Sequence, residues 1–191
     1  MNDKVITGFP EGYKAIKEAT EALEFRMASD LYTGSLLKTL AASKSSGRFL
    51  ELGAGTGLAT AWIVSGMDER SCLIAIENNE ILIDVASKNI VDSRVEFLLA
   101  DAYEWIKEYK GEKFDFIFAD AMPGKYDLFE ETIAMLNSGG LYIIDDMLPQ
   151  PNWPLGHDEK VRLFIDSLES RNDLLLTKMN WSTGIIIITK K

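Results

Sequence analysis

One short segment constrains this chain more than any other: a run of apolar residues leads directly into three glycines at alternate positions. The segment reads FLELGAGTG, from Phe49 to Gly57. Glycine is needed where the backbone takes a positive φ and where a ligand approaches main-chain amides with no Cβ in the way. The helix expected to begin near Gly57 points further free N–H groups at the same spot. The segment therefore predicts a strand, a tight turn that receives a ligand, and a helix.

The rest of the chain repeats this alternation of short apolar runs and amphipathic segments. We expect strands at 49–52, 72–76, 95–99, 114–118 and 140–144, with helices near 57–67, 80–91, 103–109 and 126–136. Two further helices, at 11–27 and 30–42, precede the first strand. Repeated strand–helix alternation predicts a parallel sheet with right-handed crossovers and helices on both faces.

The C-terminal part of the chain breaks the alternation. After a helix near 158–170, the strand-like runs Leu174–Met179 and Gly184–Thr189 are separated only by the four residues 180–183. A parallel connection needs a dozen or more residues, so these two runs pair antiparallel if they pair directly. The predicted fold is α/β: a Rossmann-like, doubly wound, seven-stranded mixed sheet with an antiparallel C-terminal strand pair.

Length and charge exclude several classes of protein. A chain of 191 residues that is 47% hydrophobic and 26% charged has the composition of one globular domain, neither disordered nor embedded in a membrane. Twenty basic against thirty acidic residues give a net charge of −10, which disfavours nucleic acids and anionic membranes as partners. The first nine residues contain no apolar h-region, so we expect no secretory signal and a cytoplasmic protein.

An acidic residue at the end of the second expected strand completes the signal from the glycine turn. Glu77 follows Gly57 by 20 residues, where a carboxylate can accept both hydrogen bonds of a ribose diol. Turn and acid together predict a nucleoside cofactor. Dinucleotide enzymes share this layout, but Leu58 stands where their fingerprint has another glycine. Glu51 would repel a pyrophosphate and could engage the cationic amino-acid end of S-adenosylmethionine (SAM).

Further segments extend this pattern along the chain. They are Ala100-Asp101, the run from Phe114 to Asp120, and Gly139-Gly140-Leu141. With the glycine turn, Glu77 and the terminal antiparallel pair, they resemble the class I SAM-dependent methyltransferases. Within that class the chain is most similar to the cation-dependent O-methyltransferases of the catechol and caffeoyl-CoA type. The resemblance implies one methyltransferase domain over 1–191, with 1–48 as a helical cover and 49–191 as the cofactor-binding core.

The resemblance also implies a cofactor site. It is drawn from the segment before the second helix, the glycine turn and the ends of three strands. The residues are Met27, Ser29, Thr33, Glu51, Gly53, Ala54, Gly55, Thr56, Gly57, Leu58, Glu77, Asn78, Asp101, Ala102 and Asp120. Asp101 is in addition a candidate cap for the helix that follows it.

Three carboxylates follow the fourth and fifth expected strands: Asp120, Asp145 and Asp146. These strands are neighbours in a doubly wound sheet, so the carboxylates would repel one another unless a proton or a cation lies among them. Oxygen ligands favour Mg²⁺, Mn²⁺ or Ca²⁺. The resemblance implies a metal site at these three residues, with Asp146 where the family has asparagine. In the alternative, Asp120 touches only the cofactor, while Asp145 and Asp146 cap the loop.

The general base is the least defined part of the pattern. The lysine that the family carries three residues after its first metal aspartate corresponds here to Pro123, and Lys125 lies two residues further on. Asp120 and Lys125 are the candidate catalytic residues. The alternative for Lys125 is a solvated loop lysine.

We therefore expect a SAM-dependent methyltransferase that methylates a small hydroxylated, phenolic or catechol-like acceptor, assisted by a divalent cation and working as a homodimer, as the family suggests. Three alternatives stay open: a metal-independent methyltransferase acting on another small molecule, a cofactor-binding protein without turnover, and an NAD-dependent oxidoreductase. Methylation of nucleic-acid bases is disfavoured, because Asp120-Ala121-Met122-Pro123 stands where amino-methylating enzymes carry Asn/Asp-Pro-Pro-aromatic.

Overall fold

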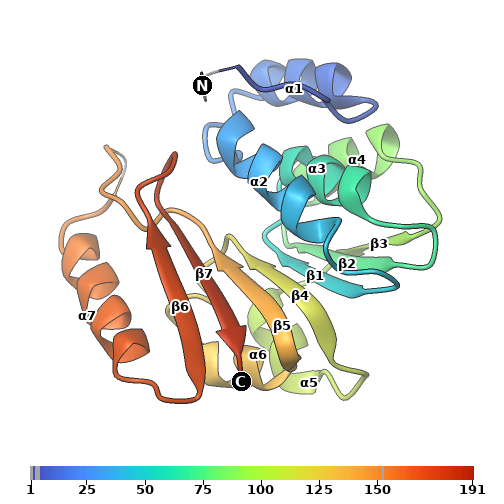
Figure 1. Ribbon diagram of the computed structural model, residues 1–191. Coiled ribbons are helices and arrows are strands. Elements are labelled where there is room, and N and C mark those ends of the chain that lie inside the picture. The colour runs from blue at the N-terminus through green and yellow to red at the C-terminus, as the bar shows by residue number, and fades with distance from the viewer. Residues whose placement is uncertain (1, 3–4, 152) are drawn as a thin grey trace.

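The protein folds into a seven-stranded sheet with helices on both faces (Figure 1). The computed structural model describes residues 2, 5–151 and 153–191. Met1, Asp3, Lys4 and Asn152 lie outside the described residues. The strands are β1 (Arg48–Leu52), β2 (Cys72–Glu77), β3 (Val95–Leu99), β4 (Phe114–Ala119), β5 (Leu136–Ile144), β6 (Leu174–Met179) and β7 (Ile185–Lys190). The helices are α1 (Tyr13–Ala22), α2 (Leu31–Ala41), α3 (Leu58–Gly66), α4 (Glu80–Asn89), α5 (Ala102–Glu108), α6 (Phe129–Ala134) and α7 (His157–Glu169). None of these helices is long and apolar enough to cross a lipid bilayer.

The strand order confirms the predicted mixed sheet. It is β3-β2-β1-β4-β5-β7-β6, parallel from β3 to β5, with β7 antiparallel to both β5 and β6. The chain runs outward from β1 to the edge strand β3 and then returns to place β4 on the other side of β1. This reversal lies between β1 and β4, and ligands of doubly wound sheets bind at the carboxyl ends of the strands at such a point.

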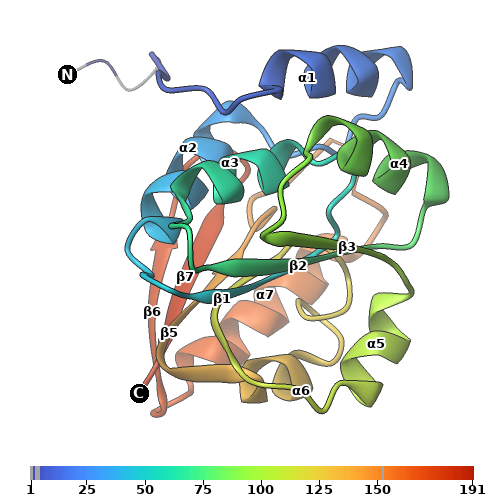
Figure 2. The same cartoon turned by 90° about the vertical axis from the view of Figure 1, so that its right-hand side faces the viewer.

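Helices cover both faces of the sheet, as expected (Figures 1 and 2). Helices α2 and α3 pack on one face, where Phe49 and Phe116 contribute to the core, and α1 lies across the outside of α3. Helices α5, α6 and α7 pack on the other face around Leu50 and Ile117. Neighbouring residues of β1 thus enter different cores, which is why its sequence is apolar throughout.

Two predicted helices are too long. The first ends at Ala22 rather than Met27, because Glu24 takes a positive φ of 52° and the chain then leaves the helix. The predicted helix 126–136 is observed only as α6, since Leu128 has a left-handed φ of 56° and β5 already begins at Leu136. The apolar pattern there runs unbroken from a helix into a strand, so periodicity alone does not separate them.

Candidate functional site

A cavity of about 700 Å³ lies at the carboxyl ends of β1, β2 and β4. Its walls are the turn after β1, the loops after β2, β3 and β4, and the segment 23–29 between α1 and α2. Most residues of the predicted cofactor site line it: Met27, Ser29, Gly53, Ala54, Gly55, Thr56, Leu58, Glu77, Asn78, Asp101, Ala102 and Asp120. The structure therefore brings together residues that are spread over more than 90 positions of the sequence.

The turn after β1 has the backbone shape that its glycines predict. Gly53, Gly55 and Gly57 have φ values of 90°, 54° and 91°. A Cβ on Gly53 would lie 2.7 Å from the carbonyl oxygen of Asp120, so only glycine allows β1 and β4 to end this close together. The N–H groups of Gly53 and Ala54 both donate to the carbonyl of Ile76 at 3.0 Å, which fastens the turn to β2.

Glu77 closes the turn from the side of β2. Its Oε2 accepts a hydrogen bond from the N–H of Gly55 at 2.9 Å, and its Oε1 accepts from the N–H groups of Asn78 and Asn79. The amide that could have cradled a phosphate is therefore already bonded to a carboxylate. A dinucleotide pyrophosphate would meet this negative charge at the turn.

Asp101 serves as a helix cap and also faces the cavity. Its Oδ1 accepts from the N–H of Tyr103 at 2.7 Å and from that of Glu104 at 3.4 Å, so it is the N-cap of α5, as predicted. The Tyr103 hydroxyl donates to Asp127 Oδ2 at 2.8 Å, which ties the loop after β3 to the loop after β4.

Three predicted cofactor residues, Thr33, Glu51 and Gly57, lie behind the cavity wall rather than in it. Glu51 is fully buried, its Oε2 accepts from Thr60 Oγ1 at 2.6 Å, and its Oε1 has no hydrogen-bond partner within the described residues. Burial raises the pKa of Glu51 to about 8. Glu51 thus lies buried beneath the turn, and its contact with a ligand stays a prediction.

The helical cover contributes residues that the sequence analysis missed. A Cβ on Gly55 would lie 3.2 Å from the ring of Phe25, so this ring packs over the turn. Thr20 on α1 and Thr56 join their hydroxyls at 2.7 Å and hold the cover in place. The sequence analysis missed these residues because it predicted a helix as far as Met27. The segment 23–29 instead lies outside the helix and forms part of the cavity wall. The missed lining residues are Leu23, Phe25, Ala28, Ala59, Ile76, Asn79, Ile81, Leu82, Ala100, Tyr103, Ala121, Met122 and Pro123.

Asp120 follows β4 and forms one wall of the cavity. Its Oδ2 accepts from Ser29 Oγ at 3.2 Å, and its Oδ1 lies 3.6 Å from Lys125 Nζ. Burial raises the pKa of Asp120, and the charge of Lys125 opposes this rise. Lys125 is only 5% exposed, so the alternative of a solvated loop lysine is wrong.

The three carboxylates of the expected metal site are not arranged as one ligand set. Asp145 is buried, and its Oδ1 accepts from the N–H of Asp146 and from Thr183 Oγ1. Burial raises the pKa of Asp145 to about 6. In the described part of the chain, no three acidic, imidazole or thiol side chains converge as metal ligands would. An ammonium lies beside Asp120 instead, and Asp145 caps its own loop, so these donors do not fit the implied cation.

The fold is Rossmann-like, and its cavity lies at the carboxyl edge of the sheet. The model of the O-methyltransferase family matches residues 11–172, and the chain belongs to this family. Curated relatives include candidate O-methyltransferases of Mycobacterium ulcerans and Mycolicibacterium vanbaalenii, which are 27% and 28% identical over 117 residues. These matches cover 58% of this chain and 52% of each relative, so the chain spans about half the length of the curated relatives it matches.

Solved structures share the fold over almost the whole chain. The O-methyltransferase TomG from Streptomyces achromogenes, in complex with SAM, has a TM-score of 0.83 and 20% identity over 99% of this chain and 93% of its own. The O-methyltransferase from Bacillus cereus, in complex with S-adenosylhomocysteine (SAH), has a TM-score of 0.85 and 20% identity over 99% and 94%. At such identities the likeness establishes the architecture.

Proposed function

We propose that this protein binds SAM in the cavity and transfers the methyl group to an oxygen of a small hydroxylated acceptor. One observation carries the proposal: in a member of the O-methyltransferase family, the glycine turn, Glu77, Asp101 and Asp120 line one cavity at the reversal point of the sheet. The relatives bound to SAM and to SAH share this fold.

The lining fits each part of SAM. Glu77 offers carboxylate oxygens to a ribose diol, and Asp101 with Ala102 borders the space for the adenine. The positive-φ glycines let the cofactor approach the main chain. Met27 and Ser29, on the cover, line the same cavity, and in this proposal they enclose the methionine part. When bound, SAM supplies a methyl group on a sulfonium.

The residues of the chain contribute mainly by positioning. Asp120 lies at the cavity wall, where its carboxylate can receive the proton that the acceptor hydroxyl loses. Ser29 and Lys125 hold this carboxylate from two sides. The cover, fastened by Thr20 and Thr56, keeps water from the cofactor.

The acceptor that we propose is phenolic or catechol-like. Met27, Met122 and Pro123 give the cavity an apolar wall next to Asp120, which suits a flat aromatic ring with one polar edge. Assistance by a divalent cation, which the family resemblance implies, is left out of the proposal because the donors do not fit it. We further propose a homodimer, as the resemblance implies, which sedimentation would report as twice the 21.4 kDa chain mass.

Binding is tested by calorimetric titration with SAM, SAH and NAD. We expect SAM and SAH to bind. We expect NAD not to bind, because the N–H of Gly55 is already bonded to the Glu77 carboxylate, whose charge would repel a pyrophosphate. Glu77→Gln should weaken SAM binding by about tenfold or more, since one charge-assisted pair of hydrogen bonds is lost. Glu96→Gln, at an exposed position of β3, is the matched control and should bind like the wild type. Binding of NAD without SAM would overturn the proposal.

Turnover is tested with methyl-labelled SAM and a panel of catechols and phenols. We expect the label to appear in the methylated acceptor. SAM binding without transfer to any member of the panel would instead favour a cofactor-binding protein without turnover.

A further inference from the structure

Lys125 is the one basic side chain that the structure buries among the described residues. A lysine ammonium is almost never removed from water unless opposite charges receive it. Its Nζ lies 3.6 Å from Asp120 Oδ1 and 5.8 Å from the centre of the Tyr126 ring. A surface lysine needs no such partner, so the burial of Lys125 points to a specific role.

The loop after β4 is folded so that Lys125 turns inward. Gly124 has a φ of 82°, and its N–H donates to the carbonyl of Asp127 at 2.7 Å. The Tyr142 hydroxyl donates to the Gly124 carbonyl from β5. A Cβ on Gly124 would lie 2.4 Å from Leu52 Cδ1, so the turn is pressed against the end of β1. Buried contacts on neighbouring strands thus fix the direction of Lys125.

Lys125 places its charge beside Asp120, the first of the three carboxylates that the family resemblance assigns to a metal, since its Nζ lies 3.6 Å from Asp120 Oδ1. A divalent ion bound to Asp120 would lie a few ångströms from this ammonium and would be repelled by it. The ammonium therefore opposes the binding of a divalent ion at Asp120.

We propose that the ammonium of Lys125 takes the place of a divalent cation in this protein, so that methyl transfer proceeds without a metal. The proposal rests on the proposed function for its chemistry. Lys125 is a positioning residue: it holds Asp120 at the cavity and compensates its charge. The acceptor oxygen forms the new O–CH₃ bond, the S–CH₃ bond breaks with its electron pair on sulfur, and the acceptor proton passes to Asp120. Lys125 keeps its own protons throughout.

The first test measures Mn²⁺ binding by electron paramagnetic resonance, which needs neither SAM nor an acceptor. The wild type should hold no stoichiometric Mn²⁺. Lys125→Met should bind Mn²⁺ at least tenfold more tightly than the wild type, because Asp120 loses its counter-ion. Lys160→Met is the matched control: Lys160 is a part-exposed lysine of α7, 3.5 Å from Asp127, and its loss should leave Mn²⁺ binding unchanged.

Two results would overturn the proposal. One is a stoichiometric Mn²⁺ site in the wild type that Asp120→Asn removes, a measurement that does not depend on the folding of Lys125→Met. The other is a Lys125→Met protein with native circular dichroism that binds Mn²⁺ no more tightly than the wild type. Neither result bears on whether SAM binds, so failure here is distinguishable from failure of the proposed function.

The second test compares methyl transfer in excess chelator and in Mg²⁺. The wild-type rates should agree within twofold, whereas Lys125→Met should become dependent on the metal, with a fall in kcat that Mg²⁺ partly restores while the KM for SAM stays close to that of the wild type. A merely structural role for Lys125 predicts no such rescue. Loss of wild-type activity in chelator, restored by Mg²⁺, would contradict the proposal.

Discussion

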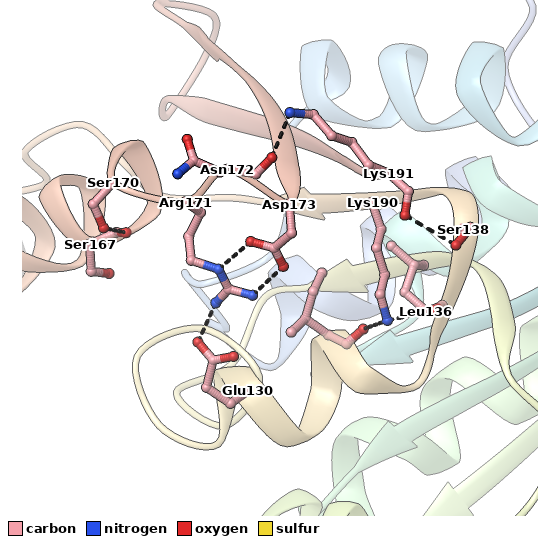
Figure 3. Close-up of polar contacts among 11 residues, drawn as sticks. Glu130, Leu136, Ser138, Ser167, Ser170, Arg171, Asn172, Asp173, Lys190 and Lys191 are labelled. Carbon is pink, nitrogen blue, oxygen red and sulfur yellow. Dashed lines mark hydrogen bonds and ion pairs between the residues drawn. The ribbon is translucent and has the colours of Figure 1, made fainter.

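Charged groups at the two ends of the sheet differ in how far they are exposed to water. At the end away from the cavity, Arg171 donates from Nε and Nη2 to the carboxylate of Asp173 and from Nη1 to Glu130 (Figure 3). Lys190 there donates to the carbonyls of Ile133, in α6, and of Leu136, the first residue of β5. The side chains of Arg171, Asp173 and Glu130 stay in contact with water, and Arg171 bonds to both carboxylates.

At the cavity end, Lys125, Asp120 and Glu51 are buried and have few partners. Lys125 and Asp120 make a single ion contact of 3.6 Å with side chains 6% and 10% exposed. The fully buried Glu51 leaves one oxygen without a partner in the described residues. Such groups cost stability unless something else requires them. The charges of the outer end therefore support the fold, whereas the buried charges at the cavity end reduce its stability.

The largest effect should follow from removing one member of the buried pair. Asp120→Asn leaves the Lys125 ammonium without its nearest counter-ion, which should lower the free energy of unfolding by about 3 kcal/mol and abolish methyl transfer. Urea denaturation followed by circular dichroism measures the first effect and labelled SAM the second. A loss of stability no larger than that of a surface ion pair would remove the contrast between the two ends.

Two glycines with positive φ give a matched pair across the sheet. A Cβ on Gly53, at the cavity, would lie 2.7 Å from the carbonyl oxygen of Asp120. A Cβ on Gly139, in the outer half of β5, would meet nothing within 4 Å. Gly53→Ala should cost about 2–3 kcal/mol and most of the SAM affinity, and Gly139→Ala only the backbone strain of about 1 kcal/mol. Denaturation and calorimetry of both variants measure the difference, and equal losses would show that crowding at the turn does not matter.

The same contrast explains which parts of the structure could be predicted from the sequence. The strands of the mixed sheet and the glycine turn were predictable, because buried parallel strands are apolar throughout and positive φ favours glycine. The loop after β4 was not, since the inward direction of Lys125 depends on Leu52 and Tyr142 from other strands. Likewise, the sequence places Glu51 near the carboxyl end of a strand, but it does not show that the side chain lies behind the cavity wall. Exposure and direction are set by tertiary contacts that residue spacing does not contain.

The pH dependence of stability should report on Glu51. Its pKa is raised by burial to about 8, so the folded state holds the proton more tightly than the unfolded state. The stability from this group is complete below its ordinary pKa of 4.5 and is lost as the pH rises through about 8. Between these values the free energy of unfolding should fall by up to about 1.4 kcal/mol per pH unit. Glu51→Gln should flatten this slope in urea titrations, while Glu96→Gln should not; an unchanged slope would contradict a neutral buried Glu51.

The smallest effect should come from the opposite end. Arg171→Met removes the bonds to Asp173 and Glu130, but all three side chains are partly solvated, so water replaces what is lost. The melting temperature should fall by no more than about 4 °C, and less in high salt, with SAM affinity and methyl transfer unchanged. The Arg171 guanidinium also holds the pKa of Asp173 at about 2, so this contribution is present above the ordinary pKa of 3.8 and is lost as the pH falls through about 2. Calorimetric melting at two salt concentrations and one acid pH measures this. If Arg171→Met instead impaired transfer while leaving the melting temperature intact, the outer end would share in the function and the two ends would no longer divide the work.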